Sequence, residues 1–247
     1  SPAGNAVLAE ICSRLMERID ARSWRSRWLQ HVTDEPIPAN AVDYRILVGM
    51  THKYMPGIPI LDATQDPELA GSVDIWCPQV QEYQRDRAEY ESQRQLGDKV
   101  WYYTCCFPGG PWLNRLLDQE LLRPVLLGWG GALFGLDGFL HWAFNQYRVD
   151  QDPFNQSVCQ NHGGGANALP PGDTHIVYPG KGRPWSSLRL EAHREGFEDY
   201  ELLRLLKERD PKVARKVLAG AIRGFDRYVK TVPRFRAARK SLLENLS

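Results

Sequence analysis

Two neighbouring carboxylates, Asp34 and Glu35, are the residues of this chain that most directly suggest chemistry. They stand in the stretch WLQHVTDEPIP, after an apolar run and just before Pro36. A pair of carboxyl groups can divide the work of a proton donor and an ionised stabilising group. Neighbouring side chains of a regular strand point to opposite faces, so the two converge only where the strand ends. Pro36 favours such an exit, because proline lacks the ladder donor and restricts the residue before it to extended geometry.

The tripeptide Asp34-Glu35-Pro36 also has a simpler interpretation. Asp-Glu-Pro is also typical of an acidic turn, or of the cap of a helix that begins near residue 40. The tripeptide alone does not decide between a catalytic pair and a cap.

Aromatic residues are the second signal, with eight Trp, ten Tyr and eight Phe. Most such rings serve a protein core. Their flat, weakly polar faces also suit sugars, so the composition raises the hypothesis of a carbohydrate site.

Several classes of function are not indicated. A net charge of +1 gives no sign of an electrostatic nucleic-acid partner, and no apolar run approaches the ~20 residues of a membrane span. Five cysteines at low density do not indicate a disulfide scaffold. Neither Cys105-Cys106 nor the scattered histidines have metal-ligand spacing, so no metal is expected. The glycine run at residues 163–165 lacks the residues of a phosphate loop and is expected to be plain loop.

The elements that must position these residues alternate along the chain. Strands are predicted at about residues 28–33, 58–63, 73–77, 99–106 and 138–147, and helices at about 5–20, 40–54, 80–96, 115–127 and 184–246. This alternation predicts an α/β fold with a parallel sheet, open or closed into a (β/α)8 TIM-type barrel, at whose carboxyl edge catalytic groups gather. Five strands are too few for a closed barrel, so either strands are missed or this chain holds only the C-terminal portion of one. The expected organisation is βα units over residues 1–183, with C-terminal helices packing on them over residues 184–247.

Several motifs carry a resemblance to a known family. The segment SSLRLEAHREGFEDYELL at residues 186–203 follows YPG at residues 178–180, and VWYYTC and DGFLHWAFNQY lie upstream. In this order, together with a strand that ends in Asp34-Glu35, the chain resembles glycoside hydrolase family 123 and its DUF4091 relatives over about residues 24–206.

The resemblance implies a (β/α)8 barrel and a retaining exo-β-N-acetylgalactosaminidase that uses substrate-assisted catalysis. The 2-acetamido oxygen of the sugar would be the nucleophile, Glu35 the general acid and base, and Asp34 the carboxylate that orients the acetamido group. No metal and no organic cofactor are implied. The implied substrate is a glycan with a terminal β-linked N-acetylgalactosamine, on a glycolipid or an oligosaccharide.

Polar and aromatic residues at strand ends become candidates for sugar binding under this resemblance. About half of them are expected in the core, because only alternate residues of a strand face one side. The candidates for stacking on the sugar, or for enclosing its acetamido methyl group, are Trp76, Tyr102, Tyr103 and Trp142; those for bonding its hydroxyls are Gln79, Asn145 and Tyr147. On the signature helix, the spacing of Arg189, Glu191, Arg194, Glu198 and Asp199 suits helix-surface pairs and loop anchoring better than catalysis.

Length is where this chain departs from the family, whose members carry a β-sandwich and early barrel strands before the Asp-Glu strand. An incomplete barrel exposes a sheet edge, which an upstream segment or a second copy of the chain would cover. Three alternatives stay open: a related glycosidase for a sugar without an acetamido group, a degenerate barrel with a carbohydrate-binding or structural role, and an unrelated α/β domain. A bacterial protein is expected. The sequence does not determine whether it is secreted or cytoplasmic.

Overall fold

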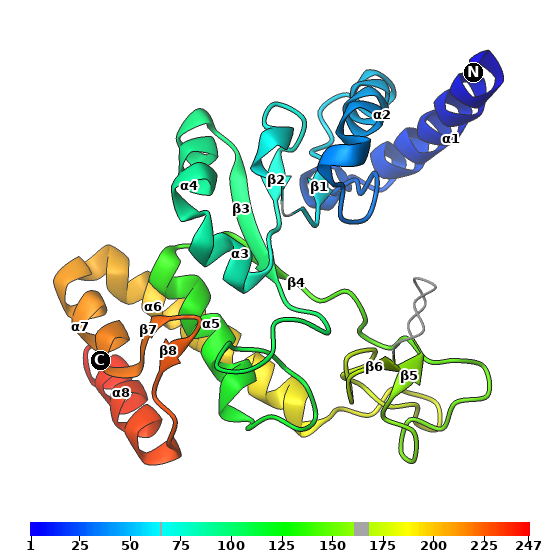
Figure 1. Cartoon of the computed structure of the whole chain (residues 1–247). Coiled ribbons are helices and arrows are strands. Elements are labelled where there is room, and N and C mark those ends of the chain that lie inside the picture. Colours follow the sequence, from blue (N-terminus) through cyan, green and yellow to red (C-terminus); the bar gives the residue numbers. More distant parts are fainter. Residues whose placement is uncertain (65, 161–167) are drawn as a thin grey trace. The chain divides into compact units, whose positions relative to one another are not determined.

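The computed structural model describes residues 1–64, 66–160 and 168–247 of the chain, so the glycine run at residues 163–165 lies outside it. The chain divides into two compact units, Ser1–Trp101 and Tyr102–Ser247 (Figure 1). Among the described helices, none is long and apolar enough to cross a bilayer.

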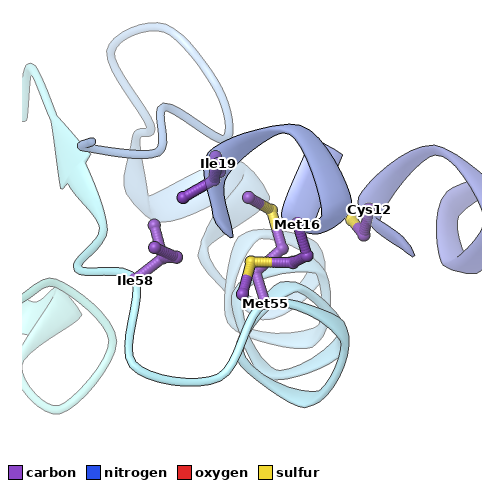
Figure 2. Packing of buried hydrophobic residues seen from close by; sticks show 5 residues of the cluster. All are labelled: Cys12, Met16, Ile19, Met55 and Ile58. Atoms are coloured by element: carbon purple, nitrogen blue, oxygen red, sulfur yellow. The ribbon is translucent and has the colours of Figure 1, made fainter. Parts of the chain in front are cut away.

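The first unit begins with two helices that confirm the predictions at residues 5–20 and 40–54. Helix α1 (Pro2–Ala21) starts at Ser1, whose hydroxyl accepts a hydrogen bond from the Gly4 N–H at 3.2 Å. Helix α2 (Ala41–Tyr54) follows after two short 3-10 turns, at Arg25–Arg27 and Pro38–Asn40. Figure 2 shows the apolar cluster that joins α1 to the end of α2 and the residues after it: Cys12, Met16, Ile19, Met55 and Ile58.

Short parallel strands follow, in the places that the sequence predicts. They are β1 (Leu61–Asp62), β2 (Ile75–Trp76) and β3 (Lys99–Tyr103), the last of which runs across the boundary between the units. Leu61 aligns with Ile75, and Ile75 with Lys99, all in parallel register. The predicted strand at residues 28–33 is reduced to a single parallel bridge between Gln30 and Ile60.

The predicted helix at residues 80–96 is present but interrupted. Asp86 separates α3 (Val80–Arg85) from α4 (Arg87–Leu96). Gly97, with φ of 112°, ends α4, in agreement with the use of glycine as a left-handed helix terminator. A third 3-10 turn, Pro67–Leu69, precedes β2.

The second unit corrects one prediction. The expected helix at residues 115–127 is instead α5 (Leu122–Phe134), which continues through the glycines at positions 128, 130 and 131. Tertiary packing explains the difference. A Cβ on Gly128 would lie 2.0 Å from the Gly196 carbonyl oxygen, and one on Gly131 would lie 2.6 Å from the Tyr102 hydroxyl. Glycine is therefore present because the neighbouring backbone and ring occupy the space of a side chain.

Helices dominate the rest of the second unit. The expected helices after residue 184 are α6 (Leu188–Arg209), α7 (Pro211–Ala221) and α8 (Val232–Glu244). The predicted strand at residues 138–147 is regular only over β4 (Gly138–Leu140). Four two- or three-residue strands form small antiparallel pairs that the sequence does not predict: β5 (Cys159–Gln160) with β6 (Ala168–Leu169), and β7 (Ile222–Gly224) with β8 (Arg227–Tyr228).

The fold class is thus mixed α/β. The principal sheet has four strands in the order β1-β2-β3-β4, which is compatible with part of a (β/α)8 barrel. A closed sheet of eight strands is not found in the described residues.

Close packing of α5 on α6 yields a testable prediction. A Cβ on Gly196 would lie 2.3 Å from the Val125 carbonyl oxygen, so Gly196→Ala should lower the free energy of unfolding by about 2 kcal/mol, the usual scale of overpacking. Gly220→Ala is the matched control in the same unit, since its Cβ would meet only Ala238 at 3.7 Å. Urea unfolding should show the control to be as stable as the parent or slightly more so. Equal stability of the two variants would contradict the close approach.

Candidate active site

Asp34 and Glu35 lie on a segment that runs beside β1 and then leaves it. Gln30 makes the last ladder contacts: its N–H donates to the Pro59 carbonyl, and its own carbonyl accepts from the Leu61 N–H, both at 2.9 Å. The segment continues past the carboxyl end of β1, where both acidic side chains are exposed. The sequence prediction that the pair follows a strand end is therefore consistent with this geometry.

The backbone at Glu35 differs from the expectation. Pro36 should hold its predecessor in extended geometry, yet Glu35 has φ of 43°, in the left-handed region. Only one other non-glycine residue among those described, Ser23, has positive φ. Such a backbone costs a glutamate roughly 1–2 kcal/mol, and strain of this kind concentrates at functional sites.

The helix-cap interpretation of the acidic pair is wrong. The N-cap position of α2 is Asn40, and the Asn40 side chain accepts from the Ile37 N–H at 2.8 Å. Neither Asp34 nor Glu35 occupies the cap.

A buried carboxylate, that of Asp62, contacts the segment that leads to Asp34 and Glu35. Asp62, at the end of β1, has no solvent exposure. Its carboxylate accepts from the Tyr44 hydroxyl at 2.6 Å and lies 2.5 Å from Nδ1 of His31. Burial, followed by the hydrogen bond to Asp62, raises the pKa of the Tyr44 phenol, which therefore stays protonated as a donor.

Two predicted sugar-binding residues of the first unit are buried. Trp76 is fully buried; its indole N–H donates to Asp98 at 2.8 Å, and its ring meets Tyr90 edge-on. Gln79 is 4% exposed and accepts from the Gln81 side chain. Both have the surroundings of a core residue.

Two of the predicted aromatic residues in the second unit are also buried. Tyr102 and Tyr103 are 1% and 2% exposed. The Tyr102 hydroxyl donates to the Leu127 carbonyl of α5 at 2.8 Å, and its ring packs against Phe139 and Phe225. Tyr102 therefore ties β3 to α5.

Trp142 differs from the other predicted aromatic residues, because 40% of it is exposed. Its indole N–H donates to Oδ1 of Asp173 at 3.2 Å. The same oxygen accepts from Nη1 of Arg115 at 2.8 Å, and both members of this ion pair are completely buried. The indole is thus held at its edge while part of the ring is open to solvent.

The surroundings of Asp173 contain unused polar atoms. Oδ2 of Asp173 and Nδ1 of His141 are buried without a hydrogen-bond partner within the described residues. Burial, assisted by the charge of Arg115, lowers the pKa of His141 to about 2. The neutral imidazole accepts from Nε of Arg115 at 3.1 Å. Buried polar atoms without a partner are rare in folded proteins, so they make this cluster unusual.

The last two predicted residues lie in the loop after β4. Asn145 is exposed and forms an antiparallel bridge with His175. The Tyr147 hydroxyl donates to the Val177 carbonyl, and its ring lies 5.5 Å from that of His175. Burial raises the pKa of Tyr147. Tyr147 therefore anchors the loop.

The signature helix is structural, as its spacing predicts. Arg189 of α6 is buried and donates to the backbone carbonyls of Arg115, Gly172 and His175 at 2.6–2.9 Å. It thereby fixes the turn that carries Asp173. Further along α6, Arg194 pairs with Glu191 and Glu198 on the exposed face, and the buried Asp199 accepts from the Trp129 indole and from Arg239 at 3.0 Å each.

Arg115 and Asp173 are the residues that sequence reasoning missed. They are 58 positions apart, and neither stands in a recognisable motif. The only signal available was a lone aspartate after the Pro-Pro-Gly turn of the polar loop. No group of three or more His, Cys, Asp or Glu side chains able to hold a metal occurs in the described part of the chain.

Comparison with known proteins defines the class. Residues 1–206 match the family profile described as "Glycoside hydrolase 123, catalytic domain", which places the chain among the glycoside hydrolases. It belongs to glycoside hydrolase family 123. No curated protein matches its sequence.

Solved structures are also similar to this chain, and one of them covers nearly its whole length. That structure is of a family 123 glycoside hydrolase from Clostridium perfringens, and it is described as showing how this enzyme hydrolyses glycolipid glycans. The TM-score is 0.67 at 15% identity, over 99% of this chain and 44% of the other. At this identity the likeness concerns the fold alone, and this chain spans less than half the length of that structure.

The left-handed backbone at Glu35 gives a prediction about stability. Glu35→Gly should give a higher free energy of unfolding than Glu35→Ala by about 1 kcal/mol, because glycine adopts positive φ without strain. At Asp34, whose φ is not positive, the order should reverse, since glycine there only adds freedom to the unfolded chain. Urea unfolding of the four variants measures both differences. The same order at both positions would show that Glu35 does not hold this backbone in solution.

Proposed function

We propose that the protein containing this chain is a glycosidase that removes a terminal β-linked N-acetylgalactosamine from a glycolipid or an oligosaccharide. The observation that carries the proposal is the exposed Asp34-Glu35 pair beyond the carboxyl end of β1, with a left-handed backbone at Glu35. Carboxyl ends of parallel strands are where α/β enzymes hold their catalytic groups. Membership of family 123 supports hydrolysis of a glycosidic bond.

The proposed mechanism is retaining and substrate-assisted. Glu35 donates a proton to the leaving oxygen and later takes one from the attacking water. The acetamido oxygen of the sugar attacks the anomeric carbon, so the protein supplies no nucleophile. Asp34 accepts from the acetamido N–H and stabilises the positive charge that develops there.

Trp142 is the proposed aromatic platform for a sugar. It is the exposed member of the predicted aromatic set, and its orientation is fixed through Asp173 by Arg115. Trp76, Tyr102 and Tyr103 are buried and are not proposed to contact the sugar.

Two other functions are distinguished by experiment. A related glycosidase for a sugar without an acetamido group would give Asp34 another task. A degenerate barrel that only binds carbohydrate would bind a β-N-acetylgalactosaminide without hydrolysing it.

The role of Glu35 is tested by Glu35→Gln in the whole gene product. Hydrolysis of a β-N-acetylgalactosaminide should fall roughly 10²–10⁴-fold, the contribution of a positioned proton donor. The loss should be greater with an alkyl than with an aryl leaving group, because an alkoxide needs the proton more. Rates like those of the parent protein on both substrates would remove Glu35 from the mechanism, and no turnover by the parent protein would favour the binding role.

The acetamido group of the substrate is tested separately. A β-galactoside with a plain 2-hydroxyl should be essentially inert, because it lacks the nucleophile. A thiazoline analogue of N-acetylgalactosamine should inhibit, since it resembles the bound intermediate. Comparable turnover of the two substrates would instead indicate a nucleophile supplied by the protein.

A further inference from the structure

The end of the ladder between residues 30 and 61 is made by side chains. In a continuing parallel ladder, the Val32 N–H would donate to the Leu61 carbonyl. Here the Val32 N–H donates to Oδ1 of Asp62 at 3.0 Å, and Nδ1 of His31 lies 3.0 Å from the Leu61 carbonyl oxygen. Two side chains have replaced one backbone hydrogen bond.

The Asp62 carboxylate is fixed by hydrogen bonds to both of its oxygens. A fully buried carboxylate is costly unless its oxygens are paired. Oδ2 accepts from the Tyr44 hydroxyl of α2, and Oδ1 is shared by the Val32 N–H and His31. The carboxylate is thereby fixed from α2 on one side and from the departing segment on the other.

The surroundings of His31 favour its protonated form. The hydrogen bond to Asp62 raises the pKa of His31 to about 9, against the opposing effect of burial, and the charge of Asp34 adds to the rise. The groups that act on it are Asp62 of β1, the Leu61 carbonyl and Asp34 of its own segment; Tyr44 of α2 meets Asp62 from the other side. The imidazole is half exposed, with 50% of its side chain open to solvent.

We propose that His31, clamped by Asp62 and Tyr44, is a positioning residue for the Asp34-Glu35 pair. It ends the ladder at the point where the pair must leave the sheet, and it keeps a cation beside Asp34. The charge of His31 strengthens its hydrogen bond to Asp62, and this bond holds the segment that carries the acidic pair. The expected effect on rate rests on the proposed function. The claim that His31 and Asp62 end the ladder does not depend on it.

The effect on rate is tested by the pH profile of kcat/KM for His31→Gln. With a pKa of about 9, His31 of the parent protein is protonated at neutral pH and loses its charge as the pH rises through about 9, so activity should decline on that alkaline side. His31→Gln should be roughly tenfold less active near pH 7, and the decline near pH 9 should be absent. His52→Gln is the matched control, because His52 is also half exposed and paired with an aspartate, Asp74, at 3.1 Å. It should keep the parent profile.

A second readout needs no activity. NMR titration of the histidine ring protons should show His31 titrating near pH 9. Asp34→Asn, an exposed substitution compatible with folding, should lower that value, and Tyr44→Phe tests the clamp without removing the buried charge. A His31 titration that is the same in the parent and in Asp34→Asn would overturn the coupling.

The two sets of outcomes separate the inference from the proposed function. Loss of activity in Glu35→Gln together with a parent-like profile in His31→Gln would overturn the positioning role alone. Full activity in Glu35→Gln, with His31 still coupled to Asp34 by NMR, would overturn the proposed function and leave the geometric inference in place.

Discussion

Burial of carboxylates is the constraint on which much of this structure depends. Asp62, Asp173 and Asp199 have no solvent exposure, and an unpaired charge in such a position costs several kcal/mol. Each is met by the same combination, an aromatic donor and a cationic group. The combinations are Tyr44 with His31, Trp142 with Arg115, and Trp129 with Arg239.

This combination changes the meaning of the aromatic composition. Tyrosine and tryptophan are abundant partly because they bury large rings while donating one hydrogen bond to an acid. Trp76 does the same for Asp98. Only Trp142 combines such a hydrogen bond with a substantially exposed ring among the four aromatic residues first considered for sugar contact. Exposure, rather than the number of rings, therefore distinguishes a candidate platform from the core.

Much of the fold follows from local sequence patterns. Apolar patterning located α1, α2 and the strands β1, β2 and β3, because each has a short-range spacing of apolar residues, with Pro or Gly near several of the ends. The helix expected at residues 115–127 lies instead at Leu122–Phe134, for a physical reason. Its glycines exist to admit the Gly196 backbone and the Tyr102 hydroxyl, and contacts between distant segments leave no local signal.

The candidate site divides in the same way. Pro36 predicted that the chain leaves the sheet near Asp34 and Glu35, although the strand expected before them is only a single bridge at Gln30. The left-handed backbone at Glu35 opposes the local preference and could not be predicted. The pairing of Arg115 with Asp173 could not be predicted, because the two residues are far apart in the sequence and meet only in the folded chain. Arg189 could be assigned to loop anchoring from its place on a helix, although not to its three particular carbonyls.

The replacement of a ladder bond by His31 and Asp62 has a consequence for how this region can vary. In a sheet, adding or removing one residue reverses the face of every side chain that follows. Here the strand-like alternation of side chains stops at Val32, because the Val32 N–H donates to the Asp62 side chain instead of to a backbone carbonyl. Residues 33–40 can therefore change in length or composition without altering the register of β1 or its neighbours. The direction of the acidic pair and the alignment of the core become separately adjustable properties of the chain.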